Sequence, residues 1–138
     1  MYKIALILIC AAVLTSCDKK EPADCEAKIC TENFAMISFS FTDKDGNPAA
    51  VKNYSAINQR TGDSIKSASA AYMNMVQGSF IVVDDAYLEK LSAEGDDIKV
   101  SATSEATAQT KSAILKVSGG KCACHVQKLS GPEKLAFD

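Results

Sequence analysis

Alternating apolar and polar residues predict strands in several parts of the chain. In "FAMISFSFT", Ile37, Phe39 and Phe41 fall on one face and the intervening polar residues on the other, which is the two-residue period of a half-buried strand. The stretches "IKVSA" and "AILKV" alternate in the same way, and "SFIVV" has the apolar run of a short buried strand. Further strands are therefore predicted at residues 50–59, 79–83, 98–102, 113–117 and 122–129.

Turn residues separate these strand candidates. "DKDGNP" at 43–48 combines a glycine, which accepts positive φ, with a proline that presets its own φ, and "RTGDS" at 60–64 is a second turn of this kind. We expect the two strands before these turns, 34–42 and 50–59, to form an antiparallel hairpin.

A short helix is predicted near residues 85–92. "DDAYLEKL" offers Asp84 or Asp85 as the N-cap and places Tyr87, Leu88 and Leu91 on one face, before a glycine that ends the segment. About seven short strands without a long amphipathic helix indicate an all-β fold. We expect a single antiparallel Greek-key β-sandwich, Ig-like or transthyretin-like, over residues 25–138.

The first sixteen residues have the pattern of a signal peptide. Lys3 precedes an apolar run from Ile4 to Leu14, which is far shorter than the roughly 20 residues of a spanning helix. Small residues then lead to Cys17, and Leu14-Thr15-Ser16-Cys17 resembles the lipobox of bacterial lipoproteins. This resemblance implies cleavage before Cys17, a diacylglyceryl thioether on its sulfur and acylation of its amino group. The alternative is an ordinary secretory signal cut elsewhere, with Cys17 as a structural cysteine.

Charge and composition set limits on the exported chain. Removal of residues 1–16 leaves 122 of the 138 residues, which suits one domain, with 14 basic and 17 acidic side chains. That balance provides no basic surface for nucleic acid or anionic lipid, so membrane attachment depends on the lipid. Residues 17–24 continue from the acylated cysteine into the polar run "DKKEPAD", which is typical of a flexible tether.

Several short motifs resemble a second family. Cys30-Thr31 leading into Phe34, the "DKDGNP" turn and "CHVQKLSGP" are similar to small bacterial envelope lipoproteins with a transthyretin-like or carboxypeptidase regulatory-like β-sandwich. Such domains are accessory or interaction modules, so the resemblance implies a binding or structural role without catalysis. It transfers no functional residue, because these domains share no catalytic motif.

Four cysteines remain beside Cys17: Cys25, Cys30, Cys122 and Cys124. An even number in an exported chain indicates disulfides. A bridge from Cys122 to Cys124 would strain a strand whose alternate side chains share a face, so long-range pairs are expected. In Greek-key sandwiches the first and last strands often run parallel as neighbours. This favours Cys25 with Cys122 and Cys30 with Cys124, and the opposite order remains open.

A metal site is the competing interpretation of "KCACH" at 121–125. Haem attachment needs two residues between its cysteines and this motif has one. In an extended strand His125, the only histidine, would face away from Cys122 and Cys124. Met73 and Met75 supply two thioethers of the kind that copper(I) favours. A periplasmic binder of copper, or of a small ligand or glycan, through Met73, Met75 and His125 is therefore the alternative function.

No catalytic constellation is recognisable, since no serine lies in a G-x-S-x-G elbow and the adjacent acids lie in turns. A glycan site would use Tyr54 or Tyr72, because the chain lacks tryptophan and Tyr87 is expected beneath its helical turn. We expect a lipid-anchored envelope protein with a non-catalytic interaction module, no cofactor beyond the lipid, and an envelope protein or glycan as partner. Asp18 is typical of inner-membrane retention in some bacteria and charged starts accompany surface export in others. The outer membrane, facing the periplasm or the cell surface, is the expected location.

Overall fold

The computed structural model describes Cys25, residues 29–67 and residues 76–138, and over these residues the chain is an all-β sandwich. Both the fold class and the single short helix predicted from the sequence are confirmed. The elements in chain order are β1 (Met36–Thr42), β2 (Val51–Asn58), β3 (Ser79–Asp84), the 3₁₀ helix η1 (Asp85–Lys90), β4 (Asp96–Ser104), β5 (Thr110–Ser118), β6 (Gln127–Ser130) and β7 (Lys134–Ala136).

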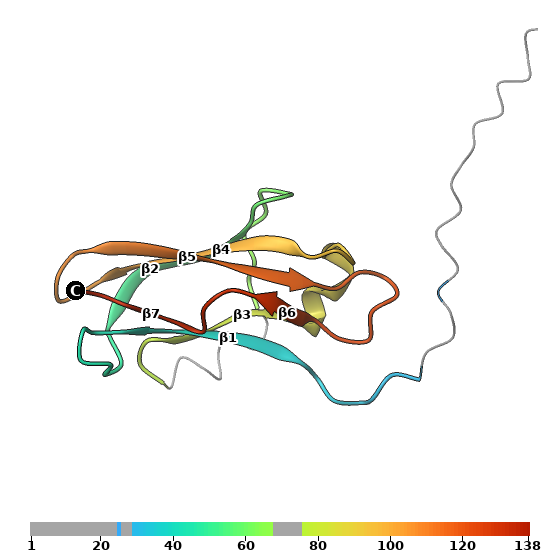
Figure 1. The fold of residues 1–138 in the computed structure, drawn as a ribbon, viewed down its shortest axis with the longest axis horizontal. Coiled ribbons are helices and arrows are strands. Elements are labelled where there is room, and N and C mark those ends of the chain that lie inside the picture. Colours follow the sequence, from blue (N-terminus) through green and yellow to red (C-terminus); the bar gives the residue numbers. More distant parts are fainter. Residues whose placement is uncertain (1–24, 26–28, 68–75) are drawn as a thin grey trace, which may run out of the picture.

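The strands form two sheets that face each other (Figure 1). One sheet has the order β3-β1-β7 and the other β2-β4-β5-β6. All pairs are antiparallel except β1 with β7, where Ser40, Phe41 and Thr42 lie opposite Lys134, Leu135 and Ala136 in parallel. The first and last strands are thus parallel neighbours. The last strand is β7, however, and β6, which forms in the region expected to be last (122–129), pairs with β5 in the other sheet.

The predicted hairpin between the first two strands is wrong, because β1 and β2 belong to different sheets. The chain turns back on β1 only as far as a bridge between Thr42 and Pro48. The ladder stops there because the N–H of Phe41 donates to the carbonyl of Gly78, just ahead of β3, and not to the returning chain. The chain instead crosses to the other sheet, where Val51 pairs with Ser104 of β4.

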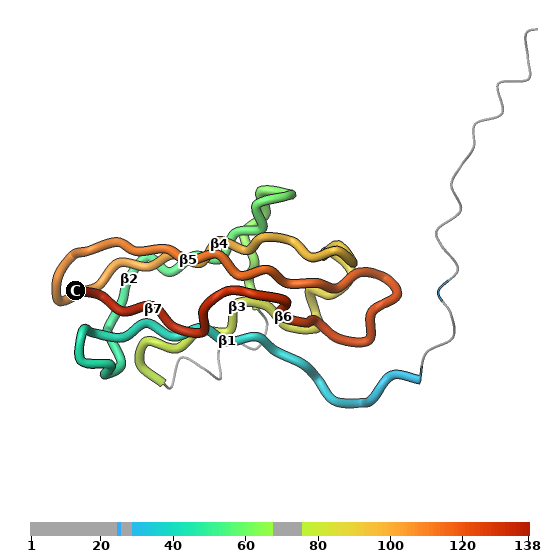
Figure 2. Tube along the Cα trace, in the orientation of Figure 1, coloured from blue at the N-terminus to red at the C-terminus, as the bar shows by residue number. Residues whose placement is uncertain are grey.

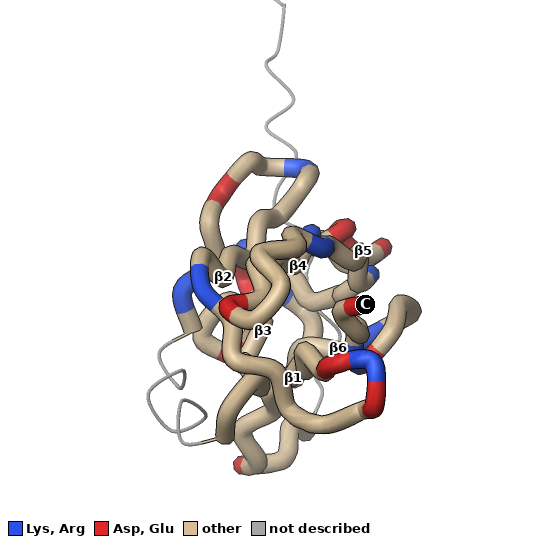
Figure 3. The backbone as a smooth tube through the Cα atoms, turned by 90° about the vertical axis from the view of Figure 1, so that its left-hand side faces the viewer, with Lys and Arg blue, Asp and Glu red and all other residues tan. Residues whose placement is uncertain are grey.

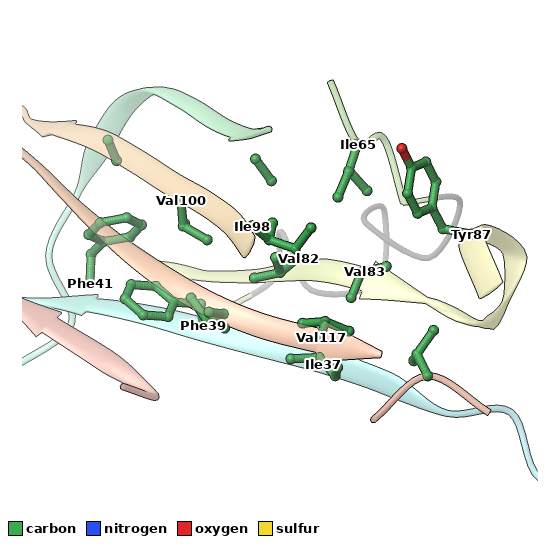
Figure 4. Close-up of a cluster of buried hydrophobic side chains, with 14 of the residues drawn as sticks. Ile37, Phe39, Phe41, Ile65, Val82, Val83, Tyr87, Ile98, Val100 and Val117 are labelled. Carbon is green, nitrogen blue, oxygen red and sulfur yellow. The ribbon is translucent and has the colours of Figure 1, made fainter. Parts of the chain in front are cut away.

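The core lies between the two sheets and comes from alternate positions of the strands (Figure 4). Phe39 and Phe41 of β1 are completely buried, and their rings meet edge to face with centroids 5.2 Å apart. Ile98 and Val100 of β4 cover them from the opposite sheet and are also fully buried. Burial of each such side chain stabilises the fold by about 1.5–3 kcal/mol relative to an exposed one.

Asp84 is the N-cap of η1, since its backbone is extended and its side chain accepts a hydrogen bond from the N–H of Ala86. Tyr87 is buried beneath the helix, as expected. Asp85 is therefore not the cap, and its carboxylate is available for contacts elsewhere.

The predicted last strand is wrong in its first half, because residues 121–125 form turns and β6 begins only at Gln127. Gly119 and Gly120 end β5, and Gly120 has a φ of +97° and donates its N–H to the carbonyl of Leu88. A non-glycine residue rarely adopts that backbone conformation, so the pair turns the chain away from the sheet. The three-residue strand β7 was not predicted, since it follows Gly131 and Pro132 and is too short to show alternation.

The sandwich has two distinct ends, which the chain trace in Figure 2 separates. At one end lie the lead into β1 (residues 29–35), η1 and the loop at 119–126. At the opposite end lie the β1–β2 connection, the β4–β5 turn and residue 138. Nine residues of β4 run between them, a span of about 30 Å at roughly 3.4 Å per residue.

Candidate functional site

Two disulfides fasten the start of the domain to the loop before β6. Cys25 is bonded to Cys122 and Cys30 to Cys124, with Cα atoms 5.3 Å apart in both pairs. These are the long-range pairs that the sequence favours, and together we call them the clasp. The clasp lies at the end of the sandwich that contains the lead (residues 29–35) and the 119–126 loop (Figure 1).

The carboxylate of Asp85 binds both segments that the clasp joins. One oxygen accepts the N–H of Ala35 at 2.8 Å, and the other accepts the N–H of Val126 at 2.8 Å. Although burial alone would raise it, these two N–H groups and His125 together lower the pKa of Asp85. Asp85 therefore stays ionised at neutral pH and holds the lead, η1 and the 119–126 loop together.

His125 connects Asp85 to the lead. Its Nδ1 lies 2.7 Å from Oδ2 of Asp85, and its Nε2 lies 2.9 Å from Oγ1 of Thr31. The Cys30–Cys124 disulfide immediately precedes Thr31 and His125 in the two segments, which explains why these two side chains meet. We call Thr31, His125 and Asp85 the latch. The expectation that His125 faces away from the cysteines depended on a strand at 122–129, and residues 121–125 form no strand.

The latch has the order hydroxyl, imidazole, carboxylate that acyl-transfer enzymes use. Such a reaction also needs preorganised donors aimed at the developing oxyanion. The backbone N–H groups of Ala35 and Val126 lie beside the latch, but both donate their hydrogen bonds to the carboxylate of Asp85 and so do not point at an oxyanion. Thr31 itself is exposed at the surface. The contacts therefore suit a structural connection between segments.

Metal binding would require changes to these contacts. Both ring nitrogens of His125 already have partners, and the four cysteines near it are in disulfides and offer no thiolate. Within residues 25, 29–67 and 76–138, no group of three or more His, Cys, Asp or Glu side chains is arranged to hold a metal. Met73 and Met75 of the alternative metal site lie outside the described residues, as do Cys17 and Tyr72.

A second polar cluster at the same end surrounds Asp96. This buried carboxylate accepts hydrogen bonds from Asn58 Nδ2 at 2.7 Å, Ser92 Oγ at 2.7 Å and Arg60 Nε at 2.6 Å. Arg60, whose side chain is half exposed, is foremost in holding the pKa of Asp96 well below its usual range. Asp97, its neighbour in sequence, is exposed on the other face of β4. The two acids do not form a catalytic pair.

Tyr54 is packed more deeply than the sequence suggests. Its ring stacks on Phe80 with centroids 4.0 Å apart, and burial raises the pKa of its hydroxyl. An exposed aromatic platform for a glycan is thus not formed by Tyr54.

The latch was missed by sequence reasoning, because an acid in a first helical turn is typical of a simple cap. The position of His125 directly after a cysteine was the available signal.

No protein-family model, no curated protein and no solved structure matches this chain. Among the described residues, no helix has the length and apolar character to cross a membrane. The class of protein that the structure defines is thus a disulfide-bonded β-sandwich.

Proposed function

We propose that the chain is a lipid-anchored protein of a bacterial envelope, acylated on Cys17, whose β-sandwich is a non-catalytic interaction module. The observation that carries the proposal is the clasp, in which both disulfides join the segment directly after the tether to the far end of the chain. Disulfides persist in oxidising compartments outside the cytoplasm, which is where a lipobox directs a protein.

The position of the clasp suits a domain held by one end. A force on the lipid reaches the domain through the tether and then through Cys25 and Cys30. Covalent bonds to Cys122 and Cys124 spread that force to the loop before β6, so the lead cannot be peeled from the fold. Two or more acyl chains hold such a protein stably on the membrane, at about 0.8 kcal/mol per buried CH₂.

The non-catalytic part of the proposal is supported by the latch. Its three side chains have the order of a catalytic triad, but the neighbouring backbone donors are bound to Asp85 and stabilise a carboxylate. Asp96 is the other acid whose pKa is held well below its usual range, and its carboxylate accepts hydrogen bonds from three side chains within the fold. Both groups connect segments of the protein.

Mass spectrometry of the native protein tests the anchor. We expect a chain that begins at Cys17, carries added acyl mass, and gains about four hydrogens on reduction, one pair per disulfide. A Cys17→Ser variant is the matched control and should move from the membrane to the soluble fraction. A chain without acyl groups, or one with four freely alkylated thiols, contradicts the proposal. Density fractionation of the membranes then tests the proposed outer-membrane location.

In-cell crosslinking tests the interaction module. A photoreactive residue in place of an exposed side chain of the anchored protein should give discrete adducts with an envelope partner. The Cys17→Ser variant should lose those adducts if the anchor positions the module. Absence of adducts from every surface of the sandwich contradicts this part of the proposal.

A further inference from the structure

The end of the sandwich opposite the clasp contains a pocket. It has a volume of about 370 Å³ and lies between the β1–β2 connection, the β4–β5 turn and residues 137–138. We call it the distal pocket. Figure 3 looks onto this end of the molecule, with the C mark on the right, between the labels of β5 and β6. Pockets of about 300–1,000 Å³ are typical of ligand sites, and this one lies at the small end of that range.

The wall of the distal pocket is apolar and rigid. Phe137 is almost fully buried, stacks on Phe41 with centroids 5.7 Å apart, and donates its N–H to the carbonyl of Thr42. Pro48, Ala49, Ala50 and Ala106 complete the apolar lining. These side chains have few rotatable bonds, so the pocket is largely preformed and binding would order few groups.

The rim carries an excess of negative charge. Asp43 and Asp45 line the pocket together with Lys44. The carboxylate of Asp43 is held by the N–H groups of Asp45 and Asn47 at 2.9 and 2.8 Å, which are neutral donors, and these bonds close the turn. Within the described part of the chain, neither Asp43 nor Asp45 forms an ion pair.

The other carboxylate at the pocket, that of Asp138, is already compensated. Its Oδ2 lies 2.9 Å from Nζ of Lys111 and accepts a hydrogen bond from Gln109 at 3.0 Å. The charge available to a ligand is therefore on the β1–β2 side, at Asp43 and Asp45. The hydrogen bonds from Asn47 lower the pKa of Asp43, so that carboxylate is ionised under physiological conditions.

An apolar cavity with carboxylates at one edge fits a side chain that has an aliphatic stem and a cationic head. Arginine and lysine have this form, and they bury the stem while the charge stays at the surface. The planar guanidinium also binds carboxylates with two parallel hydrogen bonds and is enriched in the centres of protein interfaces. Asp45 would repel an acidic ligand, and an uncharged donor would form a weaker hydrogen bond with it than a guanidinium.

We propose that the distal pocket receives an arginine side chain from an exposed segment of the partner protein, with the stem against Phe137 and the guanidinium beside Asp45. This inference rests on the proposed interaction module and names its contact surface. The pocket lies about 30 Å from the clasp along β4, so the anchor at one end leaves the other free to meet a partner.

Titration of the full acylated protein in detergent micelles with the peptide acetyl-Gly-Arg-Gly-amide tests the pocket. The same peptide with citrulline, a neutral isostere of arginine, is the ligand control. We expect saturable changes in amide NMR shifts confined to residues 43–50, 77, 104–107 and 137–138, with binding at least about fivefold weaker for citrulline. Equal binding of the two peptides, shifts elsewhere, or no saturation below about 10 mM overturns the proposal.

Charge variants provide the matched comparison. Asp45→Asn should weaken arginine binding about two- to fivefold, and Lys44→Gln should strengthen it by a similar factor. Asp97→Asn removes the same charge at the other end of β4 and should leave binding unchanged. Asp43 is not used, because its carboxylate closes the turn. If Asp45→Asn and Asp97→Asn behave alike, the guanidinium does not bind at this rim.

Crosslinking separates failure of the pocket from failure of the module. A photoreactive residue is placed at Thr107 on the pocket rim or at Lys99 on the outer face of β4. Adducts at Lys99 alone refute the distal pocket as the contact surface and leave the interaction module in place. Adducts at neither position, nor at any other surface position, refute the module itself. Adducts at Thr107 with an arginine-containing segment support both.

Discussion

The two bridges of the clasp should share somewhat less than half of the stabilisation that each would give alone. We consider variants in which Cys25 and Cys122, or Cys30 and Cys124, or all four, are replaced by serine. The cysteines of the two bridges are 97 and 94 positions apart along the chain. Taken alone, each bridge closes a long loop in the unfolded chain, worth about 4.7 kcal/mol in the chain-entropy model.

The second bridge closes a much smaller ring. Once one disulfide is in place, the other links segments that are already joined, through a ring of about nine residues (25–30 and 122–124). The same model then gives about 2.6 kcal/mol for the second bridge. Loss of either bridge should therefore lower the free energy of unfolding by about 2.6 kcal/mol, and loss of both by about 7 kcal/mol. Since domains are stable by about 5–15 kcal/mol, the variant without both bridges should be partly or wholly unfolded.

Urea unfolding of the unacylated Cys17→Ser chain, without reductant, measures these differences. A Thr31→Val variant reports the loss of the latch hydrogen bond separately, which we expect to be about 1 kcal/mol. The reasoning is refuted if each single loss lowers stability by about 4.7 kcal/mol and the two losses simply add. It is also refuted if the chain without both bridges remains within about 2 kcal/mol of the parent.

Three further predictions concern the interior and the turns. Asp96→Ala should lower the free energy of unfolding by about 2–4 kcal/mol in urea melts, because buried Asn58 loses its acceptor while half-exposed Arg60 can turn to water. The folded-state pKa of Asp96 lies below its ordinary value. Its carboxylate therefore stabilises the fold fully above about pH 5, and that contribution is lost as the pH falls through the ordinary pKa toward the lowered one. Melts from pH 6 down to pH 3 should show a steeper loss for the parent than for Asp96→Asn; parallel curves would contradict this assignment. Gly131→Ala should be more destabilising than Gly62→Ala, since both glycines have positive φ but only at Gly131 would a Cβ lie 2.5 Å from a backbone oxygen, that of Ile114. Equal losses at the two glycines would show that the contact at Ile114 relaxes.

Local patterns in the sequence predicted the elements better than their partners. The alternation at Ile37, Phe39 and Phe41 depends only on which face is buried, and β1 follows it. Whether β1 pairs with β2 depends on how the connection ends. There the N–H of Phe41 is donated to the carbonyl of Gly78, and β1 lies between β3 and β7. A pattern of apolar residues does not contain that information.

The disulfide pairs of the candidate site could be predicted from the sequence, because an even number of cysteines, their spacing and the expected export limit the possible pairings. The latch was not predictable. Asp85 had the sequence context of a helix cap, and its role depends on two N–H groups, from Ala35 and Val126, that only the tertiary fold brings to one carboxylate. His125 was assigned to a strand that Gly119 and Gly120 prevent. The distal pocket likewise combines four segments that are far apart in the chain.

The clasp also determines what a protease can release from the cell. A cut anywhere between residues 31 and 121 divides the polypeptide into two pieces, but two sulfur–sulfur bonds still join the N-terminal piece, where acylation is proposed, to the C-terminal piece. Such a nicked molecule would remain on the membrane. It would be shed only by cleavage within the short stretch between Cys17 and Cys25, or by a reductant acting after the cut.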